Sequence, residues 1–492
     1  MGQLRTTLNG TWDKNVSLKR TAGFALDWVW ILMVFYSIVP YVRSADIRGS
    51  LYTSLLVSLC ATVVTMLFVA IIVRRDERFG SNRYVVVGAA VMMTLGSVLT
   101  MFSDMSTTTG MLMLGISSIM TGTGSAVLFL AWAELFSSIG GRLALVELSA
   151  GVCAGFAAGF VLITVPSFVA DLVIVCLPLA SVAVFCRLGQ PDAETSSEPK
   201  QMLSRQTVGL FVKALFGAIL LGVIEGFFDV LSGYRTYQVQ DIYGTYLFVA
   251  GFLAALGVCI VAVFFHRDGI FHTYRFALLL LCLGCLFTPF MRDNNTYSTA
   301  LVFAGYNCFV VALAVVCIDV SRSFKVGPAR TIGLGFFALY GGEAVGSMCA
   351  HALESVGVSG YDLAAITLIA VALLFVSHLF LFTEMDLVKL GLGEINRMVP
   401  ALTDVVVTDV TAEVVDPCAV VVERYGLSPR ESDVLPLLLQ GRTISRIQET
   451  LFISAGTVST HIRHIYQKTG VENRQGLIDL VEDLLDVVEK AD

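Results

Sequence analysis

The sequence predicts an all-α protein in two parts, a long polytopic membrane bundle followed by a short, polar helical domain. Of its 492 residues, 56% are apolar and only 14% are charged, against about 25% charged residues in an ordinary soluble protein. The first 383 residues carry 22 Lys and Arg and 21 Asp and Glu, whereas the rest carry 10 and 18. This composition excludes a disordered chain and argues against a soluble enzyme.

Twelve apolar stretches are long enough to cross about 30 Å of hydrocarbon, which takes roughly 20 helical residues. Interior Gly and Pro do not disqualify them, because membrane helices tolerate both. A polar N-terminal segment, residues 1–21, precedes the first stretch and does not resemble a cleavable signal peptide. The predicted spans are 22–43, 50–73, 84–103, 110–135, 143–165, 168–188, 207–232, 244–266, 274–291, 297–319, 331–353 and 362–383.

Basic residues in the short loops predict the orientation of these spans. With the N-terminus in the cytoplasm, the inner segments hold 17 Lys and Arg and the outer loops hold four, namely Arg43, Arg48, Arg235 and Arg292. An even number of spans returns the C-terminal domain to the same side. We therefore expect a multi-pass protein of the cell membrane with both termini in the cytoplasm.

The spans divide into two sets of six, residues 22–188 and 207–383, around the polar segment between them. This layout resembles the major facilitator superfamily. The loop after the second span is similar to that family's DRxGRR-type signature, with an inserted Glu77 and Ser-Asn in place of Gly-Arg as departures. Its matching positions are Asp76, Arg78, Gly80 and Arg83. The resemblance implies a twelve-helix, six-plus-six bundle.

Acidic residues inside spans are costly and by default suggest function. Glu225 and Asp229 are four residues apart and so share one helix face. Two interpretations stay open: a site for a ligand or proton, or pairing with Lys213, Arg142 or polar side chains that fixes helix packing. The candidates are Glu134, Glu147, Glu225, Asp229 and Glu343.

Two groups of glycines inside spans predict close helix packing. Gly151, Gly155 and Gly159 recur every fourth residue in the fifth span, and Gly341, Gly342 and Gly346 cluster in the eleventh.

Residues 384–423 form a predicted linker, and residues 424–490 form a predicted domain of four helices. Its first helix begins with a capping box, in which Ser428 is the N-cap, Pro429 the first helical residue and Glu431 the reciprocal partner. A short helix over about 443–451, a turn and an N-cap at Ser454 follow. The last helix is capped by Asn473.

The helix after Ser454 has an apolar back and a small, polar and basic front. Val458, Ile462 and Ile465 recur on the inward face, and Thr460 and Arg463 lie on the other. A short helix, a turn and a helix of this kind are typical of a helix-turn-helix that reads DNA.

This region closely resembles the LuxR-type helix-turn-helix domain, with matches at Leu427-Ser-Pro-Arg-Glu431, Leu451-Phe-Ile-Ser454, Gly456-Thr-Val458 and Gly470-Val471. The resemblance implies that Ser459, Thr460 and Arg463 face bases. It places Thr457, His464 and Lys468 near phosphates. The family commonly carries Lys where Ser459 stands, and Pro436 is a second departure. Family members generally dimerise through the last helix, where the apolar stripe is Leu477, Leu480, Val481 and Leu484.

The sequence thus predicts a membrane-anchored one-component transcriptional regulator. A transporter-like bundle would sense an unidentified small molecule, and a homodimer of the C-terminal domain would bind a double-stranded DNA operator. The alternative is a secondary active transporter of the major facilitator type with an appended regulatory DNA-binding domain. No enzymatic activity, metal site or cofactor is expected, because no triad, metal-ligand set or phosphate-binding glycine loop stands out.

Overall fold

A computed structural model gives the fold of the chain. The N-terminal segment 1–15 and nearly all of the predicted linker lie outside the described residues, as do Asp76, Arg78, Gly441 and Leu484. The described residues are 16–73, 79–139, 141–188, 205–235, 244–265, 269–290, 296–323, 326–355, 363–381, 421–422, 424–439, 444–451, 453–471, 473, 476–477 and 480–481.

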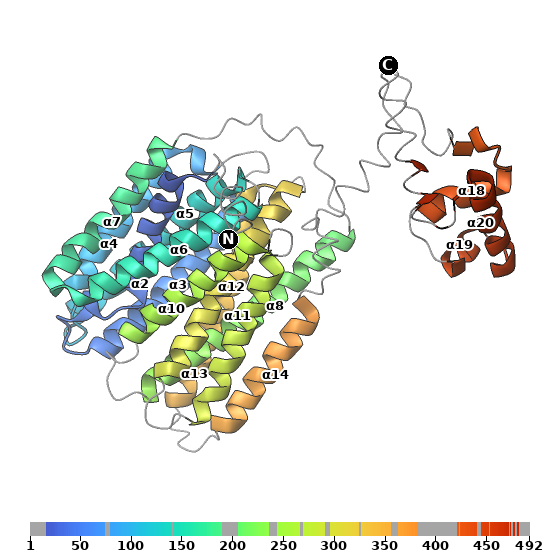
Figure 1. The fold of residues 1–492 in the computed structure, drawn as a ribbon. Coiled ribbons are helices and arrows are strands. Elements are labelled where there is room, and N and C mark those ends of the chain that lie inside the picture. Colours follow the sequence, from blue (N-terminus) through green and yellow to red (C-terminus); the bar gives the residue numbers. More distant parts are fainter. Residues whose placement is uncertain are drawn as a thin grey trace. The chain divides into compact units, whose positions relative to one another are not determined.

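Twelve long helices make up the first part of the described chain, and each overlaps one predicted span (Figure 1). The first half consists of α2 (Leu18–Phe35), α3 (Ile47–Ile72), α4 (Arg83–Met101), α5 (Thr108–Ser137), α6 (Gly141–Thr164) and α7 (Ser167–Arg187). The second half consists of α8 (Arg205–Arg235), α10 (Thr245–Phe264), α11 (Gly269–Phe287), α12 (Thr296–Ser323), α13 (Pro328–Ser355) and α14 (Leu363–Leu381). Short 3-10 turns occur at Val39–Tyr41, Phe79–Ser81 and Thr288–Phe290.

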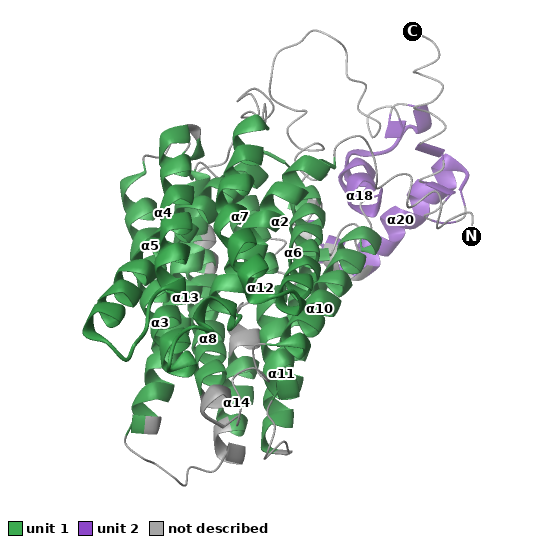
Figure 2. Cartoon of the chain, turned by 90° about the vertical axis from the view of Figure 1, so that its left-hand side faces the viewer, with its two compact units in different colours: residues 1–402 green, residues 403–492 purple. Residues whose placement is uncertain are grey.

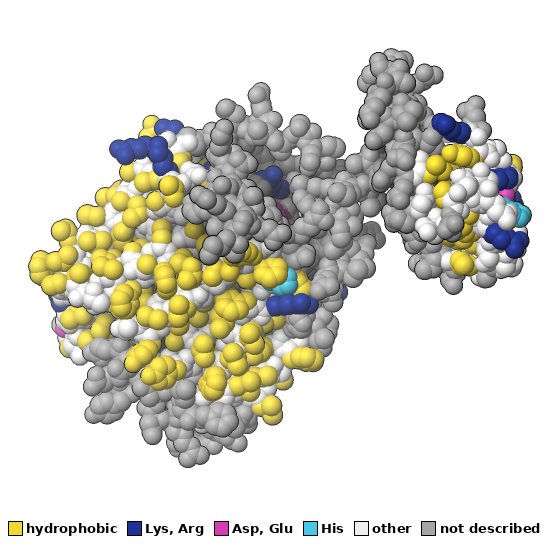
Figure 3. All heavy atoms as spheres, viewed as in Figure 1, with side chains coloured by type: hydrophobic (Ala, Val, Ile, Leu, Met, Phe, Trp, Pro, Cys, Tyr) yellow, Lys and Arg dark blue, Asp and Glu magenta, His cyan; other side chains and the backbone are white. Residues whose placement is uncertain are grey.

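Ten of these helices are long and apolar enough to cross a membrane, among the residues that the structure describes. The two others are α2, which carries Lys19, Arg20 and Asp27, and α14, whose apolar core is described over Thr367–Val376. The exact number of twelve spans therefore stays a prediction. Large apolar side chains such as Phe68, Phe168 and Phe375 are exposed on the bundle, and Figure 3 shows one face covered by such side chains, as expected of a surface solvated by lipid.

The two halves repeat one pattern of helix contacts. In the first half, α2 packs against α6 and α7, α3 against α5, and α4 against α5 and α7. In the second half, α8 packs against α13 and α14, α10 against α12, and α11 against α12 and α14. The halves meet where α3 packs against α13 and α6 against α10. Each contact therefore has a counterpart six helices further along the chain, which is the arrangement expected of a duplicated six-helix unit.

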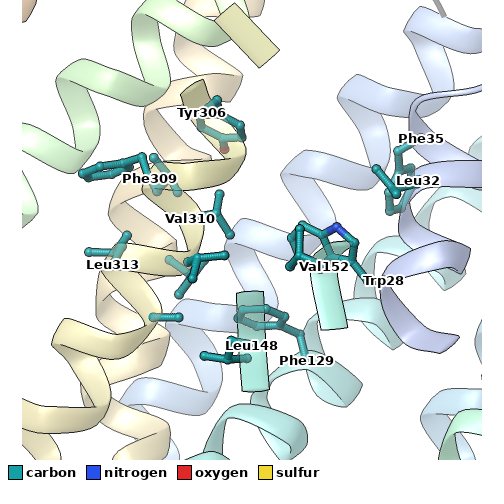
Figure 4. Close-up of a cluster of buried hydrophobic side chains, with 14 of the residues drawn as sticks. Trp28, Leu32, Phe35, Phe129, Leu148, Val152, Tyr306, Phe309, Val310 and Leu313 are labelled. Atoms are coloured by element: carbon teal, nitrogen blue, oxygen red, sulfur yellow. The ribbon is translucent and has the colours of Figure 1, made fainter. Parts of the chain in front are cut away.

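Apolar and aromatic side chains fill the space between the halves. Figure 4 shows Trp28 and Leu32 from α2, with Val152 from α6, across from Phe309 and Val310 of α12. All five side chains are buried. Of the most apolar stretch of α12, 94% is buried, so this helix lies inside the bundle with little exposure to lipid.

Glycines set the spacing of two helix pairs. A Cβ on Gly151 or Gly155 would come within 2.8 Å of Phe24 or Trp28, so small residues on α6 admit the large side chains of α2. On α13, a Cβ at Gly342 or Gly346 would lie 2.1–2.2 Å from backbone oxygens of α8. The predicted packing role of these glycines is confirmed, and Gly159 likewise meets Phe248 of α10. Gly341 is the exception, since a Cβ there meets only Val63 at 3.9 Å.

The chain divides into two compact units, Met1–Leu402 and Thr403–Asp492 (Figure 2). The division falls inside the segment 384–423 that the composition marks as a linker. In the second unit the described residues form α18 (Pro429–Leu439), α19 (Ile444–Leu451) and α20 (Ala455–Thr469). These helices have their own hydrophobic core, separate from that of the bundle.

Candidate DNA-binding surface and a buried acidic cluster

The first helix of the C-terminal unit begins at a reciprocal cap. The backbone N–H of Ser428 donates to Glu431 Oε2 at 2.7 Å, and the N–H of Glu431 donates to Ser428 Oγ at 3.4 Å. Pro429 takes the first helical position, where its missing N–H leaves no hydrogen bond unmade. The predicted capping box is confirmed, and α18 continues through Pro436 to Leu439.

A compact core fixes the orientation of α20. Val458 and Ile465 are fully buried, and Ile462 packs partly against the same core. This is the inward face that the helical spacing predicts. The buried members of the core are Val421, Leu427, Val434, Leu435, Leu438, Ile447, Val458, Ile465 and Leu477.

The opposite face of α20 is polar and accessible. Ser454 caps the helix by accepting from the N–H of Thr457 at 3.2 Å, and Gly470 ends it with a φ of 74°, a conformation that glycine adopts without steric cost. Thr457, Ser459 and Arg463 are exposed, whereas Thr460 and His464 are half-buried. Among the described residues, Arg463 has no hydrogen-bond or ion-pair partner, so its guanidinium is available to a ligand.

Glu431 joins α18 to α20. Glu431 is 4% exposed, and its carboxylate accepts a hydrogen bond from Lys468 Nζ at 2.7 Å. Lys468 also donates to the carbonyl oxygen of Gly426 at 2.9 Å, and His464 Nδ1 lies 3.5 Å from Glu431 Oε1. The resemblance places Lys468 and His464 near phosphates, but the structure turns Lys468 towards its own domain. A phosphate contact by this lysine would have to compete with two internal hydrogen bonds.

The same contacts determine the acidity of Glu431. Burial alone would raise the pKa of this carboxyl, but the hydrogen bonds from Lys468 and Ser428 and the charge of Lys468 outweigh it and lower the pKa to about 2. Glu431 is therefore ionised at neutral pH.

The start of the last helix is described only in part. Asn473 Oδ1 accepts from the N–H of Gly476 at 3.0 Å, in agreement with the predicted cap. Leu477 is fully buried in the domain's own core, and Leu480 and Val481 pack partly against it. Of the apolar stripe expected at a dimer contact, Leu477 is therefore taken by the domain's own core.

Two of the five acids proposed as an intramembrane site serve to tie helices together. Glu147 of α6 accepts two hydrogen bonds from the guanidinium of Arg20, each 2.5 Å long, and one from the N–H of Ser17 at 2.9 Å. Glu134 of α5 accepts from the backbone N–H groups of Phe79 and Gly80 at 3.1 and 2.5 Å. Glu147 thus anchors the start of α2, and Glu134 anchors the turn that contains Gly80 of the signature loop.

The other three acids lie together in the second half. Glu225 and Asp229 of α8 and Glu343 of α13 are 2%, 8% and 3% exposed, and they are close enough to interact electrostatically. Gly226 brings the two helices into contact here, since a Cβ on it would lie 2.1 Å from the carbonyl oxygen of Glu343. Lys213, a cation considered as their partner, is exposed at the other end of α8.

Sequence reasoning missed the tyrosines and one further acid. Glu343 accepts hydrogen bonds from the hydroxyls of Tyr306 and Tyr36, which come from α12 and from the residue after α2. Asp27 of α2 is fully buried, and neither of its oxygens has a hydrogen-bond partner among the described residues. The position of Asp27 inside the first predicted span was a sufficient signal. The tyrosines gave none, because aromatic residues are common in every span.

A cavity lies beside this acidic cluster, between α13 and the helices of the first half. It measures about 500 Å³, counting the part open to solvent. Glu343 and Tyr340 form its α13 wall, and Tyr36 with side chains of α2, α3 and α5 forms the remainder. Glu343 therefore belongs to both the acidic cluster and the cavity.

Known proteins are similar to this chain in both of its parts, the C-terminal region and the helical bundle. Residues 426–481 match the luxR family of bacterial regulatory proteins. The HTH-type transcriptional regulator Mb0914c of Mycobacterium bovis is 42% identical over 54 residues, which are 11% of this chain and 6% of that protein. The transcriptional regulatory protein MctR of Rhizobium johnstonii is 42% identical over 52 residues, 11% of this chain and 24% of that protein. The chain thus spans less than a quarter of the length of these relatives.

The bundle is similar in fold to solved transporters. The human organic anion transporter MFSD10 aligns with a TM-score of 0.50 and 14% identity, over 75% of this chain and 99% of that one. A bacterial homologue of the iron transporter ferroportin, in an outward-facing state, aligns with a TM-score of 0.50 and 12% identity, over 76% of this chain and 98% of that one. The chain therefore combines a helical bundle that has the fold of solved transporters with a C-terminal region, residues 426–481, that matches the luxR family of bacterial regulatory proteins.

Proposed function

We propose that this chain is a membrane-embedded transcriptional regulator, whose bundle binds a small molecule and whose C-terminal domain binds double-stranded DNA. One observation carries the proposal: a LuxR-type domain with an accessible polar face on α20 belongs to the same chain as a transporter-like bundle. The proposal assigns no chemical reaction to the chain, since a helix-turn-helix binds DNA and a major facilitator fold binds or moves solutes.

The DNA contacts are assigned to α20. Ser459, Thr460 and Arg463 face the bases, and Thr457 and His464 lie at the phosphates. Arg463 has no partner among the described residues, which supports this assignment, because arginine reads guanine through two parallel hydrogen bonds. Lys468 contributes less, since it already bonds to Glu431 and Gly426.

The topology follows from charge. The excess of basic residues in the predicted inner segments favours a cytoplasmic N-terminus, and twelve spans would return the DNA-binding domain to the cytoplasm of the cell. Tagging residue 492 tests this placement, and a tag on the outer face would remove the regulator from its DNA.

The domain is proposed to act as a homodimer on DNA. One helix-turn-helix covers a half-site, and paired domains read half-sites about ten base pairs apart. Because Leu477 is used internally, the pairing surface would rely on Leu480, Val481 and the residues that follow. A footprint with a single unrepeated half-site would count against a dimer.

Chromosome-wide mapping of the full chain tests DNA binding. We expect discrete occupied sites for the wild type and their loss in Arg463→Ala. The base contact that this variant lacks is worth about 1–3 kcal/mol. Arg430→Ala is the matched control, because Arg430 is exposed on α18 and pairs only with Asp433, at 3.4 Å, among the described residues. Occupancy that is equal in wild type and Arg463→Ala would show that the assigned face is wrong.

Secondary transport with an appended regulatory domain is the second candidate. The fold of solved transporters and the buried acids Glu225 and Asp229 favour it, because protonatable residues inside transporters serve as relays. Substrate flux in proteoliposomes that is lost in Glu225→Gln and Asp229→Asn would support transport. Intact DNA occupancy without any substrate flux would exclude transport and leave transcriptional regulation as the function.

A further inference from the structure

The cavity beside α13 is lined by hydroxyl groups whose protons have acceptors within the protein. Thr62 Oγ1 donates to the carbonyl oxygen of Gly122 at 3.0 Å, and Ser125 Oγ donates to the same oxygen at 3.1 Å. Ser58 Oγ lies 3.2 Å from Thr121 Oγ1, whose own proton goes to a backbone carbonyl. With its proton engaged in this way, each hydroxyl has lone pairs left that can accept a hydrogen bond from a ligand.

The same walls carry a carboxyl group but no basic side chain. Glu343 lines the cavity, and none of the lining residues is Lys, Arg or His. Behind it, Glu225 Oε2 has no hydrogen-bond partner among the described residues, although the side chain is only 2% exposed. A buried carboxyl group with no Lys, Arg or His beside it needs either a proton or a cation from a ligand. A cation bound at Glu343 would supply that charge.

The lining of the cavity distinguishes an organic cation from a metal ion. Nine of the thirteen residues that line it are apolar or aromatic, as in sites that hold small organic ligands. Leu59, Met66, Phe35 and Phe129 form apolar walls, which suit a hydrocarbon or aromatic body. Within the described parts of the chain, no three His, Cys, Asp or Glu side chains are grouped to hold a metal ion.

We propose that this cavity binds a protonated organic amine with an apolar body, its ammonium group on Glu343 and its body between Phe35, Met66 and Phe129. The ammonium donates to the carboxylate and to the wall hydroxyls, and the rings of Tyr36 and Tyr340 add cation–π attraction. The inference rests on the proposed role of the bundle as a ligand-binding domain, and it names the class of ligand.

Binding to the full chain in lipid nanodiscs, measured by calorimetry, tests the proposal without DNA. The probes are hexylamine, 2-phenylethylamine and tryptamine, each compared with the alcohol of the same skeleton. We expect saturable binding of at least one amine and none of its alcohol. Glu343→Gln should weaken that amine about tenfold or more, the value of a charged hydrogen bond. Glu134→Gln, the same change at an acid outside the cavity, should leave the affinity unchanged.

Three results would overturn the proposal: no amine binds the wild type, amine and alcohol bind equally, or Glu343→Gln binds the amine as the wild type does. The wild-type amine and alcohol comparison decides the matter even if Glu343→Gln fails to fold. A titration with sodium chloride in place of the amine tests an inorganic cation. Saturable binding of sodium without binding of any amine would also overturn the proposal. DNA occupancy is measured separately, so a chain that binds amine but no operator would refute only the regulator.

Discussion

The two halves of the bundle share one contact pattern, but Glu134 and Glu147 of the first half have different hydrogen-bond partners from Glu225 and Glu343 of the second. In the first half, Glu147 meets the guanidinium of Arg20, and Glu134 meets two backbone N–H groups. In the second half, Glu343 meets only tyrosine hydroxyls among its described partners, and Glu225 leaves one oxygen without any. The repeated frame positions the helices in both halves. Among the described residues, the buried acids without a basic partner that lie at the cavity are those of the second half, and Asp27 of α2 is a further unpaired acid in the first half.

The helix pairs that carry these acids also pack differently. In the first half, Phe24 and Trp28 of α2 fill the space above Gly151 and Gly155 of α6. In the second half, the backbones of α8 and α13 approach directly, as Gly346 against the carbonyl oxygen of Val223 shows. Close backbones leave little room to move one acid away from another, which keeps Glu225 and Glu343 together.

The largest effect on this comparison is expected from Arg20→Ala. Its loss leaves Glu147, whose side chain is 0% exposed, as a buried charge without its cation, at a cost of about 3–5 kcal/mol of stability. Thermal unfolding of the full chain in detergent measures the loss. Adding Glu147→Gln should restore most of it, whereas Glu343→Gln alone should cost little. Equal loss from Arg20→Ala and Glu343→Gln would erase the contrast between the halves.

A smaller effect is expected from Gly346→Ala. The new Cβ would lie 2.1 Å from the carbonyl oxygen of Val223 and push α13 off α8, at a cost of roughly 1–3 kcal/mol. Gly88→Ala in α4 is the control, since nothing lies within 4 Å of its Cβ, and alanine there should be neutral or stabilising by up to about 1 kcal/mol. If both variants unfold at the wild-type temperature, the close approach of α8 and α13 is wrong.

An acid that is paired with a base should have a lowered pKa. Glu431 in the C-terminal domain allows this expectation to be tested outside the membrane. Its folded pKa of about 2 lies below the ordinary value of 4.5. Its contribution is therefore fully present above about pH 4.5 and is lost as the pH falls towards 2. We expect the ion pair and its hydrogen bonds to contribute roughly 1–2 kcal/mol.

Unfolding of the C-terminal domain, followed in the full chain at pH 6 and at pH 3, measures that contribution. Glu431→Gln should be less stable than wild type at pH 6, and the gap should narrow at pH 3. A gap that is the same at both pH values would contradict a charged tie between α18 and α20.

Local signals in the sequence predict the helices and their caps well. Long apolar runs place all twelve described helices of the bundle, and the Ser428–Glu431 box places the start of α18. The spacing of Glu225 and Asp229 shows that they share a face. These features depend on residues a few positions apart, so periodicity alone reveals them.

Contacts between distant residues could not be predicted in this way. Arg20 and Glu147 are 127 residues apart, and Lys468 and Glu431 are 37 apart, so each partner is known only once the helices pack. Glu343 joins Glu225 because glycines bring α13 onto α8, which no pattern within either helix states. Leu477 shows the same limit, since an amphipathic helix does not say whether its own domain or a second copy covers its apolar face.

Operator occupancy by the full chain in lipid nanodiscs, with and without an amine that binds, tests most directly whether the bundle controls the DNA-binding domain. We predict that the amine changes the operator affinity of the wild type by about fivefold or more, the lower range of allosteric coupling. The same amine should have no effect on Glu343→Gln. Operator affinity that stays the same when the wild-type cavity is filled would contradict the account.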